Sequence, residues 1–124
     1  MTTLGNRTVL VVEDEWLVRM ELVQAFEDEG CTVVESPSAE GALAILREAA
    51  VIDLLVTDIR LSGAMTGWDL APEARMLKPE IEVIYVSANP PVVGRDVARS
   101  LFIDKPAMVA QVIRAAARLL AEKA

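Results

Sequence analysis

The segment Thr8-Val-Leu-Val-Val-Glu-Asp-Glu15 decides the fold, because an uninterrupted apolar run ends there in three consecutive acids. A strand that reads as continuous Val and Leu is typical of a parallel sheet covered on both faces. Carboxylates at the end of such a strand lose hydration and repel one another, so the cluster is costly unless something compensates it. We interpret Glu13 and Asp14 as part of a cation site, and Glu15 as the start of a helix.

Similar apolar runs recur along the chain and alternate with helical patterns. The predicted strands are Thr8–Val12, Thr32–Val34, Leu54–Thr57, Ile81–Val86 and, more weakly, Leu101–Ile103. Gly30 is a predicted helix stop and Ser38 a predicted N-cap, while Trp16 and Trp68 are expected to cover the seam between helices and sheet. Five strand–helix repeats predict parallel strands with right-handed crossovers, and therefore one three-layer α/β domain over residues 1–124.

Composition excludes several classes of function. Of the 124 residues 53% are hydrophobic, yet no apolar run reaches the roughly 18 residues of a membrane span. The net charge of −7 argues against direct contact with nucleic acid. The lack of histidine excludes histidine triads and a phosphohistidine, and the single Cys31 excludes an internal disulfide. No signal-peptide pattern opens the chain, so we expect a cytoplasmic protein without membrane association.

Polar residues follow four of the predicted strands. Glu13 and Asp14 follow the first, and single residues follow the third, fourth and fifth, namely Asp58, Ser87 and Lys105. Parallel sheets bind ligands at the carboxyl ends of their strands, so these side chains are expected to converge on one rim. Carboxylates about 5 Å apart repel by about 3 kcal/mol per pair at an effective dielectric near 20, a cost that Mg²⁺ removes. A carboxylate beside Mg²⁺ can also attack a phosphoryl group.

Four motifs together resemble the response-regulator receiver domain of two-component signalling. They are the acidic first strand "VLVVEDE", the segment "LLVTDIRLSG", the fourth strand "VIYVSA" and the fifth strand "LFIDKP". The resemblance covers nearly the whole chain and implies a flavodoxin-like, doubly wound (βα)5 fold with strand order 2-1-3-4-5, an order for which such receivers are a known example. The bond from Lys105 to Pro106 is a candidate for cis geometry.

The resemblance also implies a role for each residue of the rim. Asp58 would be the phosphoacceptor and would share Mg²⁺ with Asp14, with Glu13 at longer reach and with the backbone carbonyl of Arg60. The remaining roles are those of phosphoryl ligand, phosphoryl counter-ion and switch aromatic, which fall to Ser87, Lys105 and Phe102 respectively. Ser87 would move toward the phosphoryl group and Phe102 would change rotamer with it.

Two segments depart from the family pattern. Ser62 stands where the family usually has Pro, and Gly67 lies one residue later than the usual Gly, so the loop beside the site is longer. The stretch between Ser87 and Lys105 is shorter than usual and contains Pro90-Pro91 and Gly94, which disfavour a helix. We predict that the fourth helix is short or irregular, and that partner choice or dimer geometry is unusual.

Three functions are compatible with these residues. The first is a receiver, free-standing or part of a larger protein, that takes a phosphoryl group from a histidine kinase or histidine phosphotransfer protein and switches a surface for a downstream protein or a homodimer. The second is a Mg²⁺-dependent phosphatase or mutase with an aspartyl-phosphate intermediate, against which Arg60 argues, because those enzymes resemble Asp-x-Asp at the nucleophile. The third is a degenerate receiver that only binds. We expect no enzyme activity beyond self-catalysed phosphotransfer and autodephosphorylation.

Overall fold

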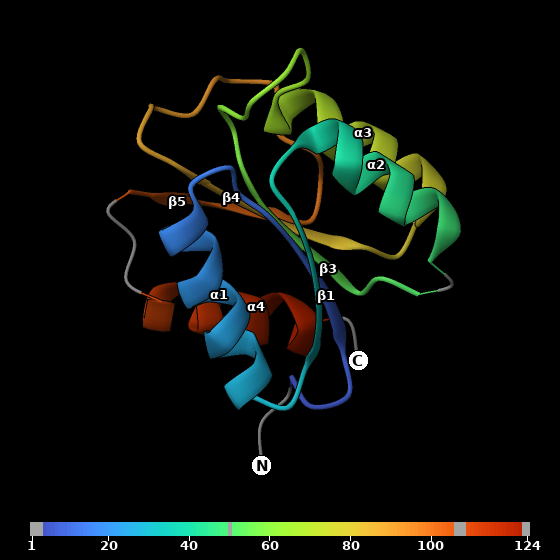
Figure 1. Ribbon diagram of the computed structural model, residues 1–124, viewed down its shortest axis with the longest axis vertical. Coiled ribbons are helices and arrows are strands. Elements are labelled where there is room, and N and C mark those ends of the chain that lie inside the picture. Colours follow the sequence, from blue (N-terminus) through green and yellow to red (C-terminus); the bar gives the residue numbers. More distant parts are fainter. Residues whose placement is uncertain (1–3, 50, 106–108, 123–124) are drawn as a thin grey trace.

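The computed structural model describes residues 4–49, 51–105 and 109–122, so Pro106, the candidate for a cis bond, lies outside them. Five parallel strands form one sheet in the order β2-β1-β3-β4-β5, as expected (Figure 1). The elements in chain order are β1 Thr8–Val12, α1 Trp16–Asp28, β2 Thr32–Ser36, α2 Ala39–Glu48, β3 Leu54–Asp58, α3 Gly67–Leu77, β4 Glu82–Ser87, β5 Ser100–Asp104 and α4 Val109–Glu122.

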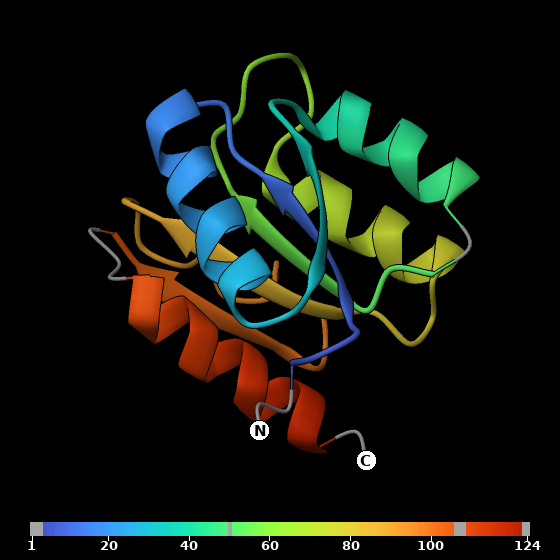
Figure 2. The same cartoon turned by 60° about the horizontal axis from the view of Figure 1, so that its bottom comes forward.

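Helices cover both faces of the sheet and create two cores (Figure 2). On one face α2 and α3 pack over inward residues such as Leu10, Leu55 and Tyr85. On the other face α1 and α4 pack over the alternate residues, among them Val11, Val56 and Ile84. Every residue of β3 is buried, which agrees with the apolar run Leu54–Val56 that begins it. Within the described ranges no helix is long and apolar enough to cross a membrane.

Local signals in the sequence explain where the helices begin and end. The Ser38 hydroxyl accepts a hydrogen bond from the backbone N–H of Gly41, which confirms the predicted N-cap of α2. Gly30 follows α1 with φ of 88°, a left-handed conformation that suits glycine. Thr66 and Asp69 form a reciprocal capping box, so α3 begins at Gly67.

The segment between β4 and β5 contains no helix. Residues 88–99 form turns and bends instead, which confirms the predicted irregularity, and the described residues contain four helices rather than the expected five. Pro90 and Pro91 remove two backbone donors, and the segment is held at its far end, where the Val97 N–H donates to the Tyr85 hydroxyl at 3.1 Å. The Arg99 guanidinium also donates to the Pro79 carbonyl at 2.6 Å.

The two tryptophans occupy different environments. Trp68 is 7% exposed and covers the seam between α3 and the sheet, as expected. Trp16 is 62% exposed, so the expectation that it covers a seam was wrong. Trp16 is the first residue of α1, and this end of the helix extends beyond the core, so the ring is left exposed.

Candidate functional site

Three carboxylates meet at the carboxyl ends of β1 and β3. Glu13 and Asp14 follow β1 and Asp58 ends β3, and these two strands are paired directly, with Val12 opposite Thr57. One carboxylate oxygen from each of Glu13, Asp14 and Asp58 lies within 4.8 Å of the other two. Glu13 and Asp58 are buried and Asp14 is exposed, so the cluster opens to solvent on the side of Asp14.

Lys105 supplies the positive charge of this cluster. Its Nζ donates to Asp58 Oδ2 at 2.8 Å and to Glu13 Oε1 at 3.0 Å. Lys105 directly follows β5, and its backbone N–H donates to the Ser87 carbonyl at 2.8 Å, which continues the pairing of β4 with β5. Burial alone would lower the pKa of Lys105, but its hydrogen bonds to Asp58 and Glu13, and their charges, outweigh burial and raise it. The ammonium therefore stays charged between the two acids.

Glu13 is held more tightly than a solvated acid. Its side chain accepts from Lys105 through Oε1 and from the Glu15 backbone N–H through Oε2, at 3.1 Å. Burial raises the pKa of Glu13, and these two hydrogen bonds oppose the rise only in part. Both oxygens of Glu13 have partners, and so do both oxygens of Asp58, whereas Asp14 is the exposed acid of the three and offers the most accessible oxygens to a cation.

The loop after β3 adds a contact that the sequence analysis missed. The Ser62 hydroxyl donates to Asp14 Oδ2 at 3.2 Å, from the position where the family usually has proline. Arg60 is exposed, and the metal role of its backbone carbonyl stays a prediction. The departure from the family was visible in the sequence, but the contact itself depends on how the longer loop folds back toward β1.

Glu40, near the start of α2, anchors the same loop. Its Oε2 accepts the backbone N–H groups of Ala64 at 3.0 Å and Met65 at 3.2 Å. Gly63 precedes them with φ of 100°, and a side chain there would collide with the Glu40 carboxylate. The pKa of Glu40 lies below its ordinary value. The main cause is a hydrogen bond from its own backbone N–H to the carboxylate, and the hydrogen bond from Met65 is the second.

The contribution of Glu40 to loop order is expected to depend on pH. An acid whose pKa is lower in the folded state stabilises the fold above its ordinary pKa, and this contribution is lost as pH falls through the lowered pKa. The amide NMR shifts of Ala64 and Met65 should therefore titrate together, with a midpoint below that of an ordinary glutamate. Glu40→Gln should remove the titration, and a midpoint at or above the ordinary value would contradict the contact.

Ser87 ends β4, the strand beside β3, and Phe102 lies within β5. The Ser87 hydroxyl is buried and accepts the Asn89 backbone N–H at 3.1 Å. Phe102 stacks on Trp68 with centroids 6.1 Å apart and ring planes 17° apart. Trp68 in turn meets Tyr85 at 4.7 Å. An aromatic row thus joins α3, β4 and β5 next to the site.

The donor set fits Mg²⁺. The cluster offers carboxylate oxygens and one exposed side, and Mg²⁺ prefers oxygen ligands while keeping several waters. Asp14 and Asp58 would hold the ion directly, and Glu13 would contribute at longer reach. Lys105 already neutralises part of the charge, so a single divalent cation is enough to balance the three acids.

Comparisons with known proteins agree with this arrangement. The family model for the response regulator receiver domain matches residues 9–117. The receiver protein of Sinorhizobium medicae is similar in structure, with a TM-score of 0.90, 30% identity, and coverage of 98% of this chain and 99% of that one. The receiver domain of the hybrid histidine kinase CckA has a TM-score of 0.80 and 28% identity, and covers 91% and 98% of the two chains.

Two curated relatives match over a small part of their length. The sensor kinase CckA of Brucella abortus is 42% identical over 84 residues, which are 67% of this chain and 9% of that protein. The alginate regulator AlgB of Pseudomonas aeruginosa is 35% identical over 81 residues, which are 65% of this chain and 18% of that protein. The match to the family model spans most of the chain, and the chain therefore belongs to the response regulator receiver domain family.

Proposed function

We propose that this chain is a single receiver domain over residues 1–124 that accepts a phosphoryl group on Asp58. The observation that carries the proposal is the bridge formed by Lys105, which contacts Asp58 and Glu13 together while Asp14 completes the acid triad. Receiver domains work with histidine kinases or phosphotransfer proteins and bind Mg²⁺ at an acidic pocket of this kind. We place the reaction in the cytoplasm, with a kinase or phosphotransfer protein as donor.

The chemical step follows from the position of Asp58. A carboxylate oxygen of Asp58 attacks phosphorus, a new P–O bond forms, and the bond from phosphorus to the donor nitrogen or oxygen breaks. The bond's electron pair leaves with the donor group, which takes up a proton from water. When bound, Mg²⁺ neutralises charge on the phosphoryl oxygens. Lys105 orients Asp58 before the reaction and would pair with the phosphoryl group after it.

Ser87 would couple the phosphoryl group on Asp58 to a change in the rest of the domain. Its hydroxyl lies at the end of β4 and accepts the backbone N–H of Asn89, the second residue of the irregular segment 88–99. A hydroxyl that turns to a phosphoryl oxygen changes this contact, and Phe102 at the neighbouring strand would adjust beside Trp68. The expected product is an altered binding surface for a downstream protein or for a second copy.

The alternatives have less support. A phosphatase of the Asp-x-Asp type needs an acid two residues after the nucleophile, and the chain has the exposed Arg60 there. A binding-only receiver would not need to keep Asp58, Lys105 and the acid pair in mutual contact. We therefore propose a stoichiometric phosphoacceptor rather than a turnover enzyme.

Intact mass after incubation with acetyl phosphate and Mg²⁺ tests the proposal. We expect one phosphoryl adduct per chain, because the donor set surrounds a single nucleophile. Excess EDTA should suppress the adduct, and hydroxylamine should remove it, as expected for an acyl phosphate. An unmodified mass with both acetyl phosphate and phosphoramidate, together with no spectral response to beryllofluoride, would leave only the binding-only reading.

A further inference from the structure

We propose that the groove between α2, α3 and the irregular segment 88–99 is a docking site for a partner segment that carries a cationic side chain next to a bulky apolar one. This partner would be the downstream protein whose binding surface changes on phosphorylation. In that respect alone the docking site rests on the proposed function. Segment 88–99, which contains no helix, contributes Gly94 and Arg95 to the groove.

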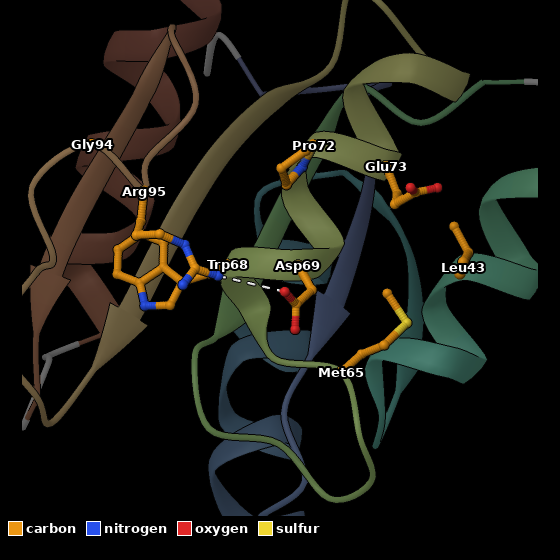
Figure 3. A pocket seen from close by; sticks show the side chains of 8 residues that line it. All are labelled: Leu43, Met65, Trp68, Asp69, Pro72, Glu73, Gly94 and Arg95. Atoms are coloured by element: carbon orange, nitrogen blue, oxygen red, sulfur yellow. Dashed lines mark hydrogen bonds and ion pairs between the residues drawn. The ribbon is translucent and has the colours of Figure 1, made fainter.

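The floor of the groove is apolar. Its volume is about 670 Å³, and Leu43 of α2 together with Met65, Trp68 and Pro72 provide the apolar lining (Figure 3). Gly94 forms the opposite wall and adds no side chain. Trp68 and Leu43 are nearly buried, so Met65 and Pro72 supply most of the exposed apolar surface, and the groove suits one apolar side chain laid on it.

The rim of the groove is acidic. Asp69 and Glu73 lie four residues apart on α3, so they occupy the same face of the helix and repel one another. Hydrogen bonds from the Thr66 backbone and hydroxyl to Oδ2 lower the pKa of Asp69, which is therefore charged and leaves Oδ1 toward the groove. Among the described residues no cation lies within ion-pair distance of Glu73.

Arg95 shows which chemistry this rim accepts. It reaches across the groove from segment 88–99 and its guanidinium lies 3.5 Å from Asp69 Oδ1, a contact drawn in Figure 3. Both side chains are 48% exposed, so the pair is weak and can exchange with an external cation. Val93 beside it is fully exposed, so the chain's own segment carries the same combination of apolar and cationic groups.

Docking and phosphorylation would share one element. Arg95 belongs to the segment that Ser87 contacts through Asn89 at one end and that Tyr85 holds through Val97 at the other. Trp68 forms the floor and also stacks on Phe102. A partner that displaces Arg95 from Asp69 therefore acts on the segment that follows Ser87.

Fluorescence polarisation with defined peptides tests the docking site. The probes are fluorescein-labelled decapeptides with one Arg and one Leu or Phe, separated by two to four residues of Gly and Ser, each paired with a copy that has Glu for Arg. A copy of residues 91–97 of this chain and its Arg→Ala form complete the set. We expect the Arg peptides to bind and their Glu counterparts not to bind.

Three variants locate the binding. Glu73→Lys should weaken binding about tenfold, Arg95→Ala should strengthen it severalfold by removing the tethered competitor, and Arg114→Ala on the opposite layer should change nothing. The proposal is overturned if no Arg peptide binds, if peptide charge is irrelevant, or if a concentration-dependent dimer forms that Val93→Ser dissolves, which would make a second copy the occupant. Phosphoryl transfer is checked separately by intact mass, so failure of binding with a normal adduct refutes only the docking site.

Discussion

Replacement of Asp58 with asparagine is expected to abolish the phosphoryl adduct altogether. The amide has the size of the carboxylate and can still accept the Ile59 N–H at 2.6 Å through its oxygen, so the loop should keep its place. It has no charged oxygen to attack phosphorus, because the amide lone pair is delocalised. Glu13 and Asp14 follow β1 rather than end β3, so neither carboxylate occupies the position of Asp58. Intact mass after incubation with acetyl phosphate and Mg²⁺ measures the loss.

Two controls make this result specific. Asp104→Asn removes an exposed carboxylate at the end of the edge strand β5 and should leave the adduct unchanged. Thr57 precedes Asp58, but its hydroxyl is buried and donates to the Asp58 carbonyl at 2.7 Å, so it should not be modified instead. An adduct that persists in Asp58→Asn would contradict the assignment, and its resistance to hydroxylamine would identify a hydroxyl as acceptor.

The strands could be predicted because a strand that is buried on both faces has a continuous apolar sequence, which is visible in the segment itself. Leu54–Thr57 is apolar except for Thr57 and differs from the observed strand by one residue. At the edge of the sheet this signal is weaker: β2 continues through Glu35 to Ser36, because backbone pairing of Ser36 with Val12 tolerates polar side chains there. The exposure of Trp16 could not be predicted, because a local pattern does not say whether another layer lies beyond a helix.

The members of the site could be predicted, but their contacts could not. Parallel topology alone brings Glu13, Asp58 and Lys105 to one rim, and the structure places them together. That Lys105 reaches Glu13 as well as Asp58 depends on side-chain rotamers and on burial of Glu13, which a linear pattern does not contain. The contact of Ser62 with Asp14 likewise depends on a loop whose anchor, Glu40, lies two elements away.

Gly67→Ala is expected to be the most destabilising single-methyl change near the site. A Cβ atom at Gly67 would lie 2.2 Å from the backbone oxygen of Asp58 and 3.0 Å from the Ile59 Cα. Backbone atoms of a buried strand cannot rotate away, so α3 must shift off the end of β3 and break the bond from the Gly67 N–H to the Ile59 carbonyl, now 2.8 Å. We expect a loss of about 3 kcal/mol in the free energy of unfolding, at the upper end of overpacking costs. Urea denaturation measures it, with a fall in Tm of roughly 10 °C.

Gly41→Ala separates a backbone collision from the general effect of an added methyl group. There the nearest atom is the Ser36 hydroxyl at 2.5 Å, a side-chain atom that can rotate, and alanine favours the helix by up to about 1 kcal/mol. Gly41→Ala should therefore change stability by about 1 kcal/mol or less in either direction. If both variants unfold at the same urea concentration, α3 is not held against the Asp58 backbone as described. If only Gly67→Ala is destabilised and its adduct also forms more slowly at a temperature where it is folded, then the close approach of α3 positions the phosphoacceptor as well as the fold.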